Sequence, residues 1–256
     1  MNTPARLATF GDRLKRGDRL LGTFVKTPHP VVIEVLGHAP LDCLCIDAEH
    51  APFDRGDLDV AILAARAADM PILVRVPGAD AAGLLNVLDL GATGVVVPHV
   101  ATAAAAQAAA AACRYGPAGR GYAGSTRAAG YGTRSLSENI DRANAEVRLI
   151  VQIEDAEALS HLDGIAAVEG VDALFIGRMD LTVSLGARSP DDPIVVKAVQ
   201  QICAAARRHG RAVGMFTATI DETRAWIDAG ATLFLLQSDQ QWLLQGARAM
   251  RQAFDS

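Results

Sequence analysis

Two acidic residues, Glu154 and Asp180, follow neighbouring apolar runs of the chain and could together hold a divalent metal ion. They are 26 positions apart (180 minus 154), which is close to the length of one strand–helix repeat, so their carboxylates could approach each other. Two oxygen ligands that leave room for water and substrate oxygens suit Mg²⁺ or Mn²⁺. In the alternative interpretation Glu154 caps the following helix and Asp180 begins the short helical turn after it.

Arg75 and His50 are the other residues that could take a direct part in a reaction. Arg75 lies inside the apolar run PILVRV, where a guanidinium group is costly to bury unless it meets an anion. It could bind a carboxylate, stabilise an enolate oxygen, or simply form an internal salt bridge. His50 follows Asp47 and Glu49 and could act as a general base, although a histidine at a strand end can also be merely exposed. His99, also at the end of an apolar run, ranks second as a base.

Eight short apolar runs would position these residues. They begin near residues 20, 43, 71, 94, 148, 173, 211 and 232, and helical patterns lie between them at 53–68, 81–90, 103–115, 192–209 and 221–229. This alternation predicts a parallel (β/α)₈ TIM barrel, with an open sheet as the alternative. In such a barrel the active site lies at the carboxyl ends of the strands, where the residues named above would converge.

The rest of the chain indicates one cytoplasmic domain over residues 1–256. A net charge of -5 without a basic stripe argues against nucleic acid, and no apolar run is long enough to span a membrane or act as a signal peptide. Four cysteines in apolar surroundings are interpreted as reduced small hydrophobes. The segment 115–135 has six glycines and three arginines, so we expect a functional loop whose Arg120, Arg127 and Arg134 could meet an anionic acceptor.

Several short motifs, taken together, resemble the metal-dependent class II pyruvate aldolases of the hydroxy-oxo-acid aldolase and citrate lyase family. The similarity runs from about Leu20 to Gln237. It rests on the segments 45–52 (CIDAEHAP), 73–75 (LVR), 88–92 (LDLGA), 97–98 (VP), 119–121 (GRG), 151–154 (VQIE) and 175–181 (FIGRMDL).

The resemblance implies a phosphoenolpyruvate/pyruvate-type barrel in which Glu154 and Asp180 bind Mg²⁺, Mn²⁺ or Co²⁺. His50 would be the base, made more basic by Asp89 or Asp47, and Arg75 would stabilise the enolate. In the substrate pocket the implied residues are Phe24, Gln152, Gly177, Met179 and Asp180. One departure from the family pattern is Arg178, which stands where many members have a proline.

The implied reaction is the reversible aldol cleavage of a 4-hydroxy-2-oxo acid to pyruvate, or a close analogue, and an aldehyde. Decarboxylation of oxaloacetate, acyl-CoA lyase chemistry and a non-catalytic binding barrel are the alternatives. The resemblance also implies a homo-oligomer, a hexamer or trimer of dimers, with the C-terminal helix 239–254 exchanged between subunits. The apolar face of that helix could equally pack on its own barrel.

Overall fold

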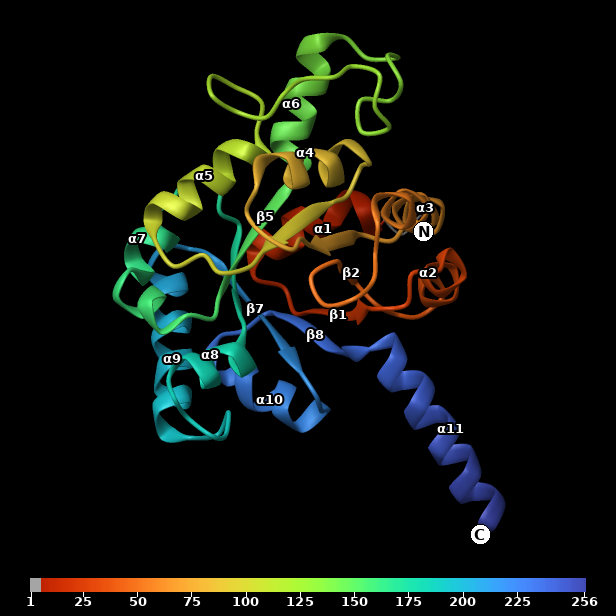
Figure 1. Ribbon diagram of the computed structural model, residues 1–256, viewed down its shortest axis with the longest axis vertical. Coiled ribbons are helices and arrows are strands. Elements are labelled where there is room, and N and C mark those ends of the chain that lie inside the picture. Colours follow the sequence, from red (N-terminus) through yellow and green to blue (C-terminus); the bar gives the residue numbers. More distant parts are fainter. Residues whose placement is uncertain (1–5) are drawn as a thin grey trace.

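All eight predicted strands are present, and they close into one parallel barrel in chain order (Figure 1). The computed structural model describes residues 6–256, so residues 1–5 of the predicted domain lie outside the described part. The strands are β1 (Leu20–Val25), β2 (Cys43–Asp47), β3 (Ile72–Arg75), β4 (Gly94–Val97), β5 (Arg148–Ile153), β6 (Ala173–Ile176), β7 (Ala212–Thr217) and β8 (Leu233–Ser238). The barrel prediction is confirmed, and the open sheet is excluded.

Helices follow the strands on the outside of the barrel. Those near predicted positions are α3 (Arg55–Ala67), α4 (Ala81–Asp89), α5 (Ala103–Cys113), α9 (Pro193–Arg208), α10 (Ile220–Ala229) and α11 (Asp239–Asp255). Those that the patterns did not predict are α1 (Arg6–Arg16), α2 (Pro30–Gly37), α6 (Leu136–Glu146), α7 (Leu162–Ala166) and α8 (Arg178–Ser184), together with a short 3₁₀ helix, η1 (Ala156–Ser160).

The core has two layers, one inside the barrel and one between the strands and the helices. Cys43 and Cys45, two positions apart on β2, lie on the same face of the strand and pack inside the barrel with Phe24 and Phe175. Phe10 and Leu14 of α1 belong to the same cluster. Since α1 precedes β1, the helix closes the amino end of the barrel and leaves the carboxyl ends of the strands as the open mouth.

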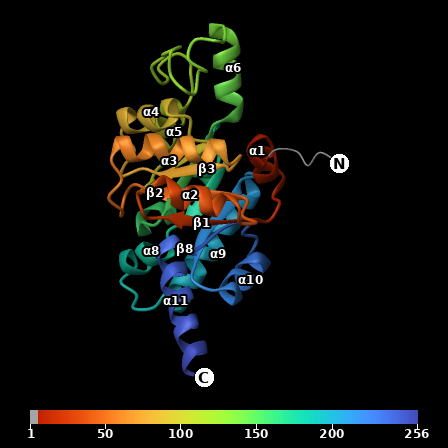
Figure 2. The same cartoon turned by 90° about the vertical axis from the view of Figure 1, so that its right-hand side faces the viewer.

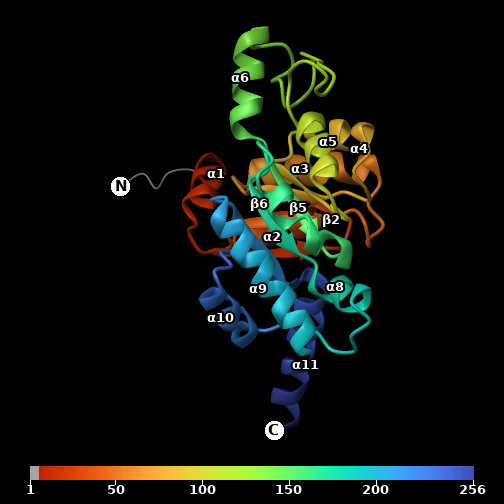
Figure 3. The same ribbon diagram turned by 90° about the vertical axis from the view of Figure 1, so that its left-hand side faces the viewer.

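Two parts of the chain project from the barrel (Figures 1 to 3). The segment 115–135 contains no helix or strand, and together with α6 it stands out at one end of the molecule. Helix α11 extends away at the other end. Within residues 6–256, no helix is both long enough and apolar enough to span a membrane.

Candidate active site

Strand pairing brings Asp47 and Arg75 together at the mouth of the barrel. They are direct neighbours in the register of β2 and β3. Arg75 donates from Nε to Asp47 Oδ1 at 3.1 Å and from Nη2 to Asp47 Oδ2 at 2.8 Å, while Lys26 Nζ lies 3.1 Å from the same Oδ2. Burial alone would raise the pKa of Asp47, but Arg75, the backbone N–H of His50 and Lys26 together outweigh burial and lower it. Arg75 is thus held rigidly, with its Nη1 group outside this pairing.

Glu49 connects Arg75 to two histidines. Its carboxylate lies 3.4 Å from Arg75 Nε, 3.6 Å from His50 Nε2 and 4.0 Å from His99 Nε2. Burial raises the pKa of Glu49, although Arg75 and His50 oppose that effect. The ring of His50 thus lies within ion-pair distance of Glu49. Asp47 instead accepts a hydrogen bond from the backbone N–H of His50, at 3.1 Å.

Glu154 is a buried carboxylate whose contacts come from the ends of β4 and β5. Its Oε1 accepts a hydrogen bond from the backbone N–H of His99 at 2.9 Å, and its Oε2 accepts one from Gln152 Nε2. His99 Nδ1 lies 3.4 Å from Glu154 and 3.1 Å from Asp155. No Lys or Arg of the described chain pairs with Glu154, which leaves a buried negative charge without a permanent cation. Such a charge is costly unless a cation reaches it.

His99 has a backbone conformation that favours this arrangement. Its φ is 55°, in the left-handed region that residues other than glycine seldom adopt. This strain costs roughly 1–3 kcal/mol and is typical of functional sites. Burial alone would lower the pKa of His99, but the hydrogen bond with Asp155 and the charge of Glu154 outweigh it and raise the pKa.

The start of α8 lies against Glu154. A Cβ atom on Gly177 would lie only 2.5 Å from Glu154 Oε2 and 3.1 Å from Gln152 Nε2, so this close approach requires glycine. Met179 and Asp180 follow in the first turn of α8 and are both exposed. Asp180 is therefore not the helix cap, a position held by Gly177, and Glu154 does not cap η1, which Asp155 precedes. The capping interpretation of the two acids is wrong.

Arg178 points away from the acids. It forms an ion pair with Glu222 at 2.8 Å, and its guanidinium group stacks over the ring of Trp226 at 5.5 Å. The arginine that replaces a proline of the family pattern thus ties α8 to α10, and its charge is already neutralised.

Phe24 contributes an apolar wall beside Arg75. Its ring lies 4.8 Å from the guanidinium carbon of Arg75 and packs against Phe175 and Phe216 at centroid distances of 6.4 and 6.2 Å. An arginine over an aromatic face keeps its charge while its stem is shielded from water.

Asp89 is the predicted residue that the structure does not bring to this mouth. It ends α4 and forms an ion pair with Arg120 at 2.7 Å. Because α4 runs back toward the amino end of β4, a single chain does not place Asp89 next to His50. Of the other loop arginines, Arg127 pairs with Asp59 at 2.6 Å and Arg134 donates to the carbonyl of Ala128 at 2.9 Å.

One residue of the site, Lys26, received no role from the sequence, whereas Glu49 and His99 were already noted there as residues that follow strands. Lys26 and Glu49 contact the Asp47–Arg75 pair, and His99 contacts Glu154. All three lie within two or three residues of a strand end, which is the signal that identified His50 and Glu154. Applied to β1 as well, that signal would also have found Lys26.

Known proteins resemble this chain over nearly its whole length. The family described as HpcH/HpaI aldolase/citrate lyase matches residues 20–245. A hydroxypyruvate/pyruvate aldolase of Paraburkholderia phytofirmans is 39% identical over 249 residues, which cover 94% of each protein. A 5-keto-4-deoxy-D-glucarate aldolase of Klebsiella pneumoniae is 34% identical over 236 residues, which cover 91% of each.

The fold is shared as closely as the sequence. The crystal structure of an HpcH/HpaI aldolase/citrate lyase family protein from Burkholderia cenocepacia J2315 superimposes with a TM-score of 0.92 at 35% identity. The superposition covers 97% of this chain and 99% of that one.

Proposed function

The chain belongs to the HpcH/HpaI aldolase/citrate lyase family, and on that premise we propose that it cleaves a 4-hydroxy-2-oxo acid reversibly into a 2-oxo acid and an aldehyde. Family membership confirms the resemblance drawn from the sequence, and the relatives described above are named as aldolases. The chain is accordingly a carbon–carbon lyase. The single observation that carries the proposed mechanism is the buried Glu154 carboxylate facing the same mouth as the anchored Arg75.

The donor set suits a divalent cation. Glu154 is 2% exposed and lacks a Lys or Arg partner among the described residues, and the Oε1 atom of Gln152 is buried without a hydrogen-bond partner. We assign Glu154 and Asp180 as the protein ligands of Mg²⁺, Mn²⁺ or Co²⁺. No group of three or more His, Cys, Asp or Glu residues within residues 6–256 is arranged for a metal, so substrate and water oxygens would complete the coordination. When bound, the ion would polarise the 2-oxo group.

The side chains of the mouth each have a separate role in the proposed reaction. His50 accepts the proton of the C4 hydroxyl, the C3–C4 bond breaks, and the aldehyde leaves. Negative charge then develops on the oxygen at C2, where Arg75 donates from the Nη1 group that Asp47 and Glu49 do not occupy. Gln152 and the turn from Gly177 to Met179 hold the carboxylate, and Phe24 shields the reacting carbons. Protonation at C3 gives pyruvate, or hydroxypyruvate where C3 carries a hydroxyl group.

Two assays test this function on the intact chain. After chelation, we expect Mg²⁺, Mn²⁺ or Co²⁺ to restore pyruvate formation from a 4-hydroxy-2-oxo acid and to promote deuterium exchange at the methyl group of pyruvate. His50→Ala and Arg75→Ala should each lower kcat on the order of 10²-fold or more. If metal-loaded wild-type protein neither formed pyruvate nor exchanged its methyl protons, the aldolase assignment would be wrong.

We also propose that the chain acts as a homo-oligomer. Helix α11 extends from the barrel (Figure 1), and its side chains are exposed apart from the first turn and a half. A role for Asp89 beside His50 is consistent with an oligomer as well, because that contact would have to come from another copy. A cytoplasmic location stays a prediction from the sequence.

A further inference from the structure

A polar cavity lies at the opposite end of the barrel from the catalytic mouth. Its volume is about 500 Å³, which is within the range of sites for small metabolites. It is bounded by the ends of α3 and α4, the segments before β4 and β5, and one side of α6 and α1. None of the proposed catalytic residues lines it.

Arginine dominates the lining of this cavity. Five arginines face it, against the three acids Asp12, Asp69 and Glu146. Three of the arginines are neutralised by carboxylates: Arg120 by Asp89, Arg148 by Asp172 and Arg142 by Glu146. Arg66 and Arg134 form no ion pair with a carboxylate within the described part of the chain, although the charge of Arg134 acts on Glu138 of α6 and helps to lower the pKa of that carboxyl.

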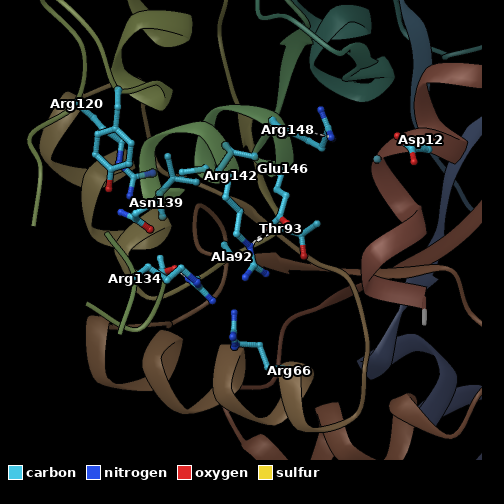
Figure 4. Close-up of a pocket in the computed structure, with 18 of the residues that line it drawn as sticks. Asp12, Arg66, Ala92, Thr93, Arg120, Arg134, Asn139, Arg142, Glu146 and Arg148 are labelled. Carbon is cyan, nitrogen blue, oxygen red and sulfur yellow. Dashed lines mark hydrogen bonds and ion pairs between the residues drawn. The ribbon is translucent and has the colours of Figure 1, made fainter. Parts of the chain in front are cut away.

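The guanidinium groups of Arg66, Arg134 and Arg142 point toward one another across the cavity (Figure 4). Burial lowers the pKa of Arg66, and the nearby charges of Arg127, Arg142 and Arg134 lower it further. Converging like charges repel unless an anion lies between them.

Buried donors without partners line the same cavity. Asn139, on the first turn of α6, is 3% exposed, and its Nδ2 group has no hydrogen-bond partner. The Nε groups of Arg120 and Arg148 are also buried and unpaired. Buried donors are normally satisfied, so a cluster of unsatisfied ones indicates an absent acceptor.

We propose that this cavity binds a small, multiply charged oxyanion, such as a phosphate ester or a polycarboxylate, at a site separate from the aldol site. Arg66 and Arg134 supply positive charge that no ion pair neutralises, and Asn139 supplies a directional donor. The proposal explains the glycine-rich segment 115–135: it delivers Arg134 and α6 to the amino end of the barrel. It goes beyond the proposed function and does not depend on it.

Calorimetric titration of the intact protein in EDTA tests the proposal, with pyrophosphate and citrate as separate probes and sodium chloride at matched ionic strength as the reference. We expect saturable binding of at least one probe. Arg66→Gln and Arg134→Gln should each weaken it on the order of tenfold, and Asn139→Asp should abolish it by placing a negative charge in the cavity. Arg224→Gln, an exposed arginine of α10 paired only with Asp221 among the described residues, is the matched control and should bind as the wild type does. The probe that binds more tightly distinguishes a phosphate from a carboxylate ligand.

Three results would overturn the proposal. One is heat equal to that of sodium chloride, which would reflect screening alone. Another is binding that survives in the Arg66→Gln/Arg134→Gln double variant but disappears in Arg75→Ala, since the anion would then occupy the catalytic mouth. The third is a double variant that binds the probe with wild-type affinity but differs from the wild type in molecular mass measured by light scattering. That result would mean that the cavity receives an acidic segment of a second copy.

Discussion

Asp47 and Arg75 occupy paired positions of adjacent strands, and this pairing determines which atoms of Arg75 face the substrate. The sequence left two interpretations of Arg75 open, an internal salt bridge and an anion-binding role. The two interpretations are compatible, because Arg75 uses Nε and Nη2 for the salt bridge with Asp47 whereas its Nη1 group stays outside the pair. The salt bridge with Asp47 therefore orients the Nη1 group of Arg75 toward the substrate.

Removing the negative charge of Asp47 should consequently impair catalysis, because Arg75 would lose its anchor. We expect Asp47→Asn to lower kcat roughly 30-fold, since charge-assisted hydrogen bonds of about 2 kcal/mol are lost. The KM for the oxo acid should change less. Asp163→Asn removes a carboxylate that also pairs with an arginine, Arg208, but on the exposed surface, and it should leave kcat unchanged. A full kcat in Asp47→Asn would show that Arg75 does not need this anchor.

The same pair predicts how stability depends on pH. Burial alone would raise the pKa of Asp47, but Arg75, the backbone N–H of His50 and Lys26 together lower it below the ordinary value of 3.8. Since the folded-state pKa lies below the unfolded-state pKa, the stabilisation is complete above about pH 4 and is lost as the pH falls through the lowered value. Urea unfolding should therefore show a constant gap in free energy of unfolding between wild type and Asp47→Asn from about pH 5 to 7. The gap should close at lower pH, and a gap independent of pH would contradict the assignment.

At the scale of elements, the strands were the most predictable part. Each is a short apolar run buried on both faces, which is the pattern typical of strands in a parallel sheet covered by helices. Helices such as α1 and α8 owe their position to contacts with the rest of the fold: α1 closes the amino end of the barrel, and α8 is anchored by Arg178 on α10. Asp89 was given its role beside His50 by resemblance alone, whereas its place at the end of the predicted helix 81–90 already indicates the amino end of the barrel.

The junction between β6 and α8 sets the distance between the two proposed metal ligands. Gly177→Ala would place a Cβ atom 2.5 Å from Glu154 Oε2 and 2.7 Å from its Cβ, so the carboxylate must move. We expect the affinity for Mn²⁺, measured by calorimetry in the presence of pyruvate, to fall roughly 10- to 100-fold, as for other changes around metal ligands.

Gly116→Ala provides the matched control, since nothing lies within 4 Å of the added atom. It should bind Mn²⁺ as the wild type does. Equal affinities in the two variants would mean that Glu154 does not need this close approach, and the assignment of Glu154 as a ligand would then lose its support.

At the scale of the whole molecule, the two ends of the barrel differ: the carboxyl end carries the proposed catalytic residues, and the amino end is basic. The mouth holds the acids, the bases and Arg75, whereas the amino end holds the arginine-lined cavity beneath α6. In TIM barrels the carboxyl end carries catalysis and the amino end carries stability. The concentration of unpaired donors at the amino end departs from that division, since unpaired buried donors cost stability instead of adding to it.

Helix α11 supplies the last prediction. Leu243, Ala247, Met250 and Phe254 recur with helical spacing and form one stripe, on which the three large side chains are 68%, 75% and 80% exposed. Such an apolar stripe on an extended helix favours burial against another copy. We expect Leu243→Glu and Met250→Glu to lower the molecular mass measured by light scattering, because a buried charge would oppose association. Gln245→Glu and Gln252→Glu add the same charge to the opposite face of α11 and should leave the mass unchanged. A wild-type mass equal to that of one chain would contradict the oligomer directly, and equal masses in all four variants would place its interface elsewhere than this stripe.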